Sequence, residues 1–142
     1  MSSIYVNLPV NDLAVAARFY EAIGCKKNEQ FSDDKAASMV WSDTITFHLL
    51  TREYFATFAP REVADAHGTC QVLLALTRDR REDVDAITQA AATNGGKADI
   101  REPMDMGWLY NRAFEDADGH VFEAVWMDMD AAANMPSESS ST

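Results

Sequence analysis

The chain has few basic residues and few cysteines. Its 142 residues include 12 Lys and Arg against 23 Asp and Glu, so the formal net charge is −11. Without a basic surplus to neutralise phosphates, we expect neither nucleic acid nor a membrane surface as a partner. No apolar run approaches the ~20 residues that a membrane-spanning helix needs. Because the Met1 end also shows no charged-then-apolar signal pattern, we expect a cytoplasmic protein.

Several chemical signatures are also missing. Cys25 and Cys70 form neither a CxxC pair nor a disulfide framework, so we expect two reduced, partly buried thiols. The sequence contains no nucleophile elbow, no Walker loop and no GxGxxG, which removes the basis for a hydrolase or a nucleotide-binding protein. What remains is an ordinary globular domain, and we expect a small molecule as its ligand.

The main positive signal is a repeated pattern of strands and helices. An alternating strand over 4–10 is followed by an amphipathic helix over 12–24 and by short strands over 28–32, 36–41 and 44–50. The same order returns with a strand over 69–77, a helix that begins at a capping box of Asp79 and Glu82, and strands near 98–101, 107–115 and 120–127. Each half is thus β-α-β-β-β. We predict an α+β fold in which two such modules form a curved mixed sheet with the helices on its outer face.

The predicted modules span residues 1–68 and 69–130 and together make one domain. Within the first, residues 51–68 show no strand alternation and mix aromatic with charged side chains, which is typical of a lid or a short helix over a site. Phe55 and Phe58 are its expected anchors. The tail over 131–142 is rich in small and polar residues, so we predict that it is disordered.

One strand carries an unusual carboxylate. Asp116 to Gly119 reads as a tight turn, and in the strand after it Glu123 shares a face with Val121 and Val125. A charged carboxylate among valines is costly unless a partner compensates it. We therefore expect a cation, a hydrogen-bond donor, a metal ion or water to face Glu123.

The duplicated modules resemble the vicinal-oxygen-chelate superfamily, which includes glyoxalase I, extradiol dioxygenases, fosfomycin-resistance transferases and bleomycin-binding proteins. The resemblance rests on Val10-Asn11-Asp12-Leu13 leading into a helix with Phe19-Tyr20, and on the stretch from Glu115 to Glu123. It implies a glyoxalase-like fold. It is much less specific for a reaction, because this scaffold serves isomerases, oxygenases, transferases and drug-sequestering proteins.

The resemblance also implies four metal-ligand positions, one on the first and one on the last strand of each module. They correspond here to Tyr5, His48, Leu73 and Glu123. Only His48 and Glu123 bind a divalent ion well, because leucine has no lone pair and neutral tyrosine is a poor ligand. A register shift of two residues would replace Leu73 by Gln71, which with His48 and Glu123 gives a glyoxalase-like set of Gln, His and Glu.

Two functions therefore stay open. In the first, nickel, zinc, manganese or iron held by His48, Glu123 and Gln71 supports a lyase or isomerase of the lactoylglutathione-lyase type, with Glu123 also moving a proton as a catalytic residue. In the second, a cup without metal or other cofactor sequesters a small aromatic or cationic compound. Homodimerisation is implied by the resemblance in both cases. The expected ligand-binding side chains are Tyr5, Asn7, Leu73, Trp108, Tyr110 and Arg112.

Overall fold

The computed structural model describes residues 1–134 of the chain. The first module begins with strand β1 (Ile4–Val10), whose even-numbered side chains become progressively buried while Tyr5 and Asn7 stay exposed. Its other elements are helix α1 (Leu13–Ala22), strand β2 (Lys26–Asn28), the short 3-10 helix η1 (Glu29–Phe31), and strands β3 (Ala36–Val40) and β4 (Ile45–Thr51). The strand that the sequence predicted over 28–32 is wrong, because Asn28 caps η1 by accepting a hydrogen bond from the Gln30 N–H.

Helix α1 begins and ends where its sequence indicates. The Asp12 carboxylate accepts the N–H of Val15 at 3.1 Å, which satisfies one of the free donors at the helix N-terminus. Gly24 follows the helix with φ of 123°, a conformation that residues other than glycine rarely adopt. Between these ends, Phe19 and Tyr20 are completely buried, so one face of the helix anchors the core.

The segment between the modules contains a short helix, α2 (Arg52–Phe58), which packs against β1 and β4. The Arg52 guanidinium donates to the carbonyls of Val63 and Ala64, both at 3.3 Å, and so ties the following loop to the helix. This agrees with the short helix expected within residues 51–68. Whether it acts as a lid stays a prediction.

The second module repeats the order of the first with shorter outer strands. It contains strand β5 (Leu73–Thr77), helix α3 (Arg81–Thr93), strands β6 (Lys97–Ala98), β7 (Met104–Asp105), β8 (Leu109–Glu115) and β9 (Val121–Met127), and a final helix α4 (Met129–Ala133). The predicted capping box of Asp79 and Glu82 is wrong, because α3 begins after Arg80 without a side-chain cap. The predicted disordered tail is contradicted at 131–133 by α4, and 135–142 lie outside the described residues.

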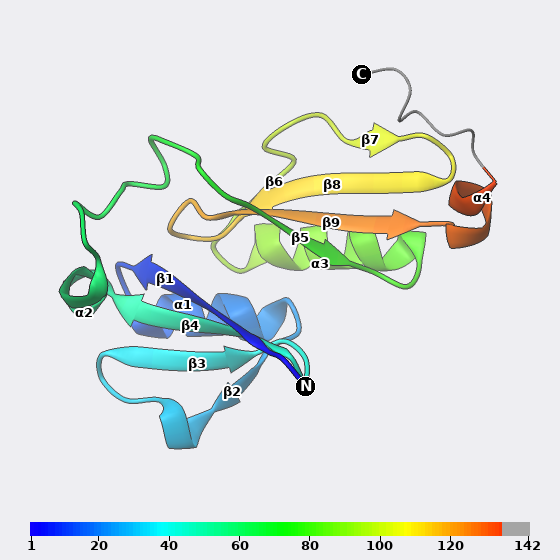
Figure 1. The fold of residues 1–142 in the computed structure, drawn as a ribbon. Coiled ribbons are helices and arrows are strands. Elements are labelled where there is room, and N and C mark those ends of the chain that lie inside the picture. The colour runs from blue at the N-terminus through cyan, green and yellow to red at the C-terminus, as the bar shows by residue number, and fades with distance from the viewer. Residues whose placement is uncertain (135–142) are drawn as a thin grey trace.

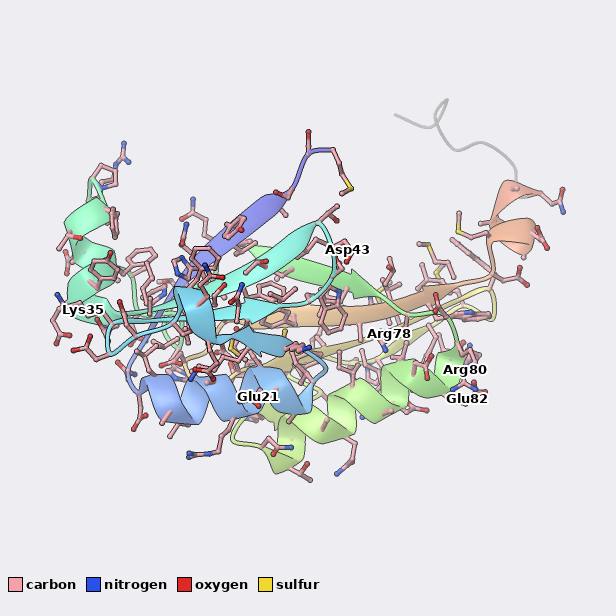
Figure 2. The ribbon with its side chains drawn as sticks, turned by 90° about the horizontal axis from the view of Figure 1, so that it is seen from below. Glu21, Lys35, Asp43, Arg78, Arg80 and Glu82 are labelled. Carbon is pink, nitrogen blue, oxygen red and sulfur yellow. The ribbon has the colours of Figure 1, made fainter. Side chains whose placement is uncertain are left out.

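The strands form two mixed sheets, one per module (Figure 1). Their orders are β1-β4-β3-β2 and β5-β9-β8-β6, with β7 paired to β8. In each sheet the first strand of the module runs parallel to the last, as β1 to β4 and β5 to β9. Helices α1 and α3 contact each other and lie along the same side of the molecule (Figure 2). Each sheet therefore has one face covered by a helix and one open face.

The core lies between the helices and the covered faces of both sheets. Tyr20 contacts Phe47 of β4 and Phe122 of β9, with ring centroids 5.6 and 5.9 Å apart. Phe122 also stacks on Phe114 of β8 at 5.5 Å, and Phe19 contacts Phe114 at 6.3 Å. Because one aromatic cluster joins both modules, the two halves fold as one hydrophobic unit.

Polar contacts at the β8-β9 turn reinforce this junction. The buried Asp116 carboxylate accepts the Tyr20 hydroxyl at 2.7 Å and the N–H groups of Asp118 and His120 at 2.9 Å each. Asp118 in turn accepts the N–H of Asn11 at 2.8 Å. The turn expected from Asp116 to Gly119 is confirmed, with Gly119 at φ of 89°.

The two free cysteines differ in exposure. Cys25 is buried, but Cys70 is exposed rather than partly buried, because it lies in the loop before β5. Within residues 1–134, none of the helices combines the length and the apolar character required to cross a bilayer.

Candidate functional site

The open face of the first sheet carries His48, as its strand alternation indicates. Its neighbours Phe47 and Leu49 point into the core, while His48 is half-buried on the other side. In the register of the sheet, Asn7 of β1 and Ser38 of β3 lie on either side of it. His48 Nδ1 is 3.0 Å from Asn7 Oδ1. An amide oxygen only accepts, so Nδ1 is the donor in this contact, and in the neutral ring Nε2 is then the acceptor that faces a ligand.

A pocket of about 870 Å³ opens beside this pair. Helix α2 contributes three aromatic side chains to its wall, Tyr54, Phe55 and Phe58, and the rings of Tyr54 and Phe58 pack edge to face at 5.0 Å. The other lining residues include Ile4, Tyr5, Val6, Asn7, His48, Leu50, Arg61, Glu62, Gln71, Val72 and Leu74. A smaller pocket of about 290 Å³ continues along β1 and shares Asn7, Phe55 and Gln71 with it. The site is thus largely apolar with a few polar groups, as is usual for small-molecule pockets.

Gln71 and Leu73 do not share a strand face as the sequence suggested. Strand β5 begins only at Leu73, so Gln71 lies in the preceding loop, where it lines the pocket together with His48 and Asn7. Leu73 is 57% exposed, and the residue opposite Glu123 in the parallel pair is Ala75. The strand predicted over 69–77 is therefore four residues too long at its start.

Glu123 lies on the open face of the second sheet and faces a cation. Arg101 Nη2 is 2.5 Å from Glu123 Oε2 and also 2.5 Å from Asn111 Oδ1. Ala75 and Ala113 flank Glu123 on the neighbouring strands, so neither offers it a hydrogen bond. The expectation that a cation or another partner faces this carboxylate is confirmed, and the partner is Arg101.

The structure separates the candidate metal ligands. His48 and Gln71 line the large pocket, whereas Glu123 is absent from the lining of both pockets and pairs with Arg101. Among residues 1–134, no three His, Cys, Asp or Glu side chains gather as a metal would require. The residues present do not fit a divalent metal centre within one chain, because the strongest anionic donor already has a guanidinium as its counter-ion.

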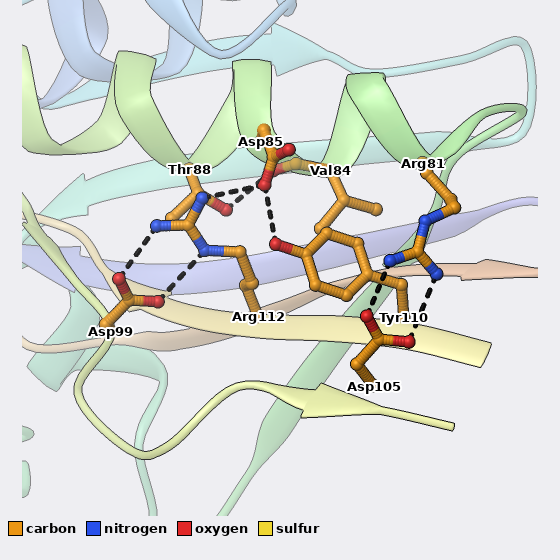
Figure 3. A network of polar contacts seen from close by, with 8 residues as sticks. All are labelled: Arg81, Val84, Asp85, Thr88, Asp99, Asp105, Tyr110 and Arg112. Atoms are coloured by element: carbon orange, nitrogen blue, oxygen red, sulfur yellow. Dashed lines mark hydrogen bonds and ion pairs between the residues drawn. The ribbon is translucent and has the colours of Figure 1, made fainter. Parts of the chain in front are cut away.

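The predicted ligand-binding residues of β8 lie on its helix-covered side (Figure 3). Tyr110 donates to Asp85 of α3 at 2.7 Å, and Arg112 lies between Asp85 and Asp99 at 2.9 and 2.7 Å. The hydrogen bond from Arg112 holds the pKa of Asp99 below its ordinary value. Trp108 precedes the strand, and neither it nor Tyr110 nor Arg112 lines the two pockets. A role of these three in ligand binding stays a prediction.

Sequence reasoning missed two groups of residues at the site. The first is the aromatic wall of α2, of which only Phe55 and Phe58 were expected as anchors; Tyr54 joins them. The second is Arg101 with Asn111. The Glu123 carboxylate signalled the need for a partner, but the strand predicted over 98–101 is wrong. Strand β6 ends at Ala98, so Arg101 lies in the loop that follows, where strand alternation could not place it.

The chain belongs to the Glyoxalase/Bleomycin resistance protein/Dioxygenase superfamily, whose family model matches residues 3–124. No curated protein matches the chain. Among solved structures, a hypothetical protein from S. aureus is 27% identical, with 89% of this chain and 94% of that chain covered and a TM-score of 0.75.

Two more distant structures share the fold. A glyoxalase/bleomycin resistance protein/dioxygenase family enzyme from Burkholderia phytofirmans is 19% identical, with 89% and 99% of the chains covered and a TM-score of 0.72. The fosfomycin resistance protein FosX from Mesorhizobium loti is 15% identical, with 92% and 95% covered and a TM-score of 0.65. Together with the two modules described above, these similarities confirm the glyoxalase-like fold expected from the sequence.

Proposed function

We propose that the chain binds a small, flat, largely apolar molecule in the pocket between the open face of the first sheet and helix α2. The observation that carries this proposal is the composition of the pocket. Three aromatic side chains of α2 face a wall whose few polar groups include the hydrogen-bonded pair His48 and Asn7. Aromatic rings supply large contact area with preferred stacking geometries, and one polar pair is enough to orient a ligand.

The charges around the pocket favour an aromatic ligand over a strongly cationic one. Arg61 and Glu62 both line the pocket, so the charged side chains at its edge balance each other. The overall charge of −11 attracts cations to the protein as a whole but is not concentrated at this pocket. His48 Nε2 accepts a hydrogen bond from a ligand hydroxyl or N–H, while the rings of α2 cover the flat face of the ligand.

The alternative is the isomerase of the lactoylglutathione-lyase type. It would need His48, Gln71 and Glu123 to surround one nickel, zinc, manganese or iron ion, with Glu123 free to take a proton. The pairing of Glu123 with Arg101 weighs against this arrangement. Elemental analysis and a titration with these four metals separate the two functions, since one bound equivalent that His48→Ala abolishes would support the isomerase.

We also propose that the protein is a homodimer. Side chains at the rim of the pocket leave more than half of their surface exposed, namely Ile4 at 56%, Tyr5 at 60%, Val72 at 58% and Phe58 at 66%. Contiguous exposed apolar surface of this kind is typical of an interface. Sedimentation velocity checks the assembly directly, and a monomer at every concentration would contradict the homodimer.

The cytoplasmic location expected from the sequence stays a prediction.

Binding of neutral aromatic probes tests the main proposal. Indole and 2-naphthol are titrated into the protein and followed by the NMR amide signals of Asn7 and His48. We expect saturable shifts, and a loss of about tenfold in affinity for Phe58→Ala, equivalent to about 1.4 kcal/mol. The matched control is Phe31→Ala, which removes a similarly exposed ring, at 61% against 66%, from η1, outside the pocket. Equal affinities for both variants, or no saturable shifts at Asn7 and His48, would refute the proposal.

A further inference from the structure

The open face of the second sheet holds a guanidinium whose hydrogen-bond donors are largely used within the protein. Arg101 Nη2 donates to Glu123 and to Asn111, which uses both hydrogens of that nitrogen. Nη1 donates to the carbonyl of Glu102 at 3.0 Å. The donors left over, on Nε and on Nη1, do not lie side by side as a fork for an incoming carboxylate or phosphate. Arg101 therefore serves Glu123 and Asn111 rather than an anionic ligand.

The two oxygens that Arg101 contacts are those that a cation at this face would use. Carboxylate and amide oxygens are ligands that hard divalent ions accept, and here both already coordinate one positive group. The pair is partly shielded from water, since the side chains of Arg101 and Glu123 are 35% and 19% exposed. An ion pair in such a setting is costly to break on one side only.

The loop that carries Arg101 is held at both ends. On one side, Arg112 binds the Asp99 carboxylate with two hydrogen bonds of 3.0 and 2.7 Å. On the other, Arg81 of α3 binds Asp105 at 3.2 and 2.6 Å and stacks over the Tyr110 ring at 4.5 Å. Figure 3 shows these two clamps side by side along α3. Arg101 is thus positioned on Glu123 by a fixed loop instead of reaching it from solvent.

Space for the guanidinium comes from the strands beside Glu123. The residues opposite it in the register are Ala75 of β5 and Ala113 of β8, each with a single methyl group. Small side chains on both sides leave room above the sheet for the planar guanidinium, and neither competes for the carboxylate. The small residues on the strands, the two clamps and the charge pairing all favour the Arg101 guanidinium as the group beside Glu123.

We propose that Arg101 takes the place of a divalent metal ion at Glu123. The guanidinium is a built-in cation that neutralises this carboxylate, so the open face of the second sheet needs no metal to be stable. Arg101 is a positioning residue, because its Nη2 holds the Glu123 carboxylate beside the Asn111 amide oxygen. This inference does not depend on the aromatic pocket of the first sheet.

The test combines metal titration with thermal unfolding of four proteins: the wild type, Arg101→Met, Glu123→Gln and the double variant. We expect nickel and zinc to give identical calorimetric titrations with the wild type and with Glu123→Gln. Arg101→Met should lower Tm by about 5 °C, and the double variant should recover at least half of that loss. Zinc should raise the Tm of Arg101→Met more than that of the wild type, because the freed carboxylate then accepts a metal.

A metal equivalent that binds the wild type and is lost in Glu123→Gln would overturn the proposal. So would losses in Tm that simply add in the double variant, since additivity means that the two side chains are not coupled. If Arg101→Met does not fold, Arg101→Lys provides the same comparison, because it keeps the charge and loses the planar fork; we then expect a smaller loss in Tm. Indole binding should be the same in Arg101→Met and the wild type, which separates this result from that of the pocket.

Discussion

The hydrogen bond between Tyr20 and Asp116 should be among the polar contacts that stabilise the protein most. Tyr20 is completely buried and Asp116 is 3% exposed, and their oxygens are 2.7 Å apart. The contact joins α1 of the first module to the β8-β9 turn of the second. We therefore predict that Tyr20→Phe, which removes one oxygen and keeps the ring, destabilises the whole domain.

The magnitude follows from what the missing hydroxyl leaves behind. Asp116 Oδ1 keeps its two backbone N–H donors at 2.9 Å, but Oδ2 loses the hydroxyl in a buried place. Leaving a buried charged acceptor without its donor costs about 2–3 kcal/mol. For a domain of this size each kcal/mol lowers Tm by about 3 °C, so we expect a loss of roughly 6–9 °C.

Calorimetry and urea unfolding at pH 7 measure this cost. The control is Tyr5→Phe, whose ring is 60% exposed, so its hydroxyl is hydrated in the folded and unfolded chain alike. A loss below ~1 kcal/mol for Tyr20→Phe, or an equal loss for Tyr5→Phe, would refute the reasoning. Burial, followed by the nearby Asp116 carboxylate, raises the pKa of Tyr20 well above its ordinary value. The wild type should therefore lose stability as pH rises above about 10, and Tyr20→Phe should lose less over that range.

Three further outcomes follow from the structure. Burial raises the pKa of Cys25 to about 12, so Ellman's reagent at pH 8 should label the exposed Cys70 quickly and Cys25 only after unfolding; fast labelling of both would contradict this. Gly96→Ala should cost about 1–3 kcal/mol of stability, because the added Cβ would clash with the backbone carbonyl of Glu115 and lie 2.6 Å from the Phe19 ring. The control Gly68→Ala meets only ordinary contacts at 3.7 Å and beyond. Arg112→Met should lower the free energy of unfolding by about 1 kcal/mol at pH 7 and by less at pH 3. The stability that comes from the lowered pKa of Asp99 is present above the ordinary Asp pKa and is lost as pH falls. An equal loss at both pH values in urea unfolding would exclude this coupling.

Periodicity predicted those parts of the fold that depend on burial of one face. The alternation of β1, β4 and β9 placed Phe47 and Phe122 in the core and His48 and Glu123 on the open faces, as the structure has them. Prediction failed where contacts distant in sequence decide the conformation. Residues 69–72 alternate as a strand would, yet β5 pairs with β9 only from Leu73, so Gln71 turns toward the pocket.

Contacts distant in sequence also decide which face of β8 carries Tyr110 and Arg112. Their alternation with Asn111 showed correctly that they share one face of β8, but not which face that is. Asp85 and Asp99 decide it, because two acidic groups on the helix side compensate the Arg112 charge there. Those partners are 27 and 13 residues away in the sequence, outside the range of any local pattern.

The two modules share a backbone plan but differ in the chemistry beside their equivalent strands. His48 has Asn7 and Ser38 opposite it in the register, so a polar partner for the ring is available within its own sheet. Glu123, on the corresponding strand of the second module, has Ala75 and Ala113 instead. A carboxylate between two methyl groups must find its compensation outside the strands, and the loop after β6 supplies Arg101. The strand pattern thus placed His48, Asn7 and Glu123 on the open faces but predicted neither of the two pairings. The partner of Glu123 depended on a loop whose position is determined by Arg81 of α3 and Arg112 of β8.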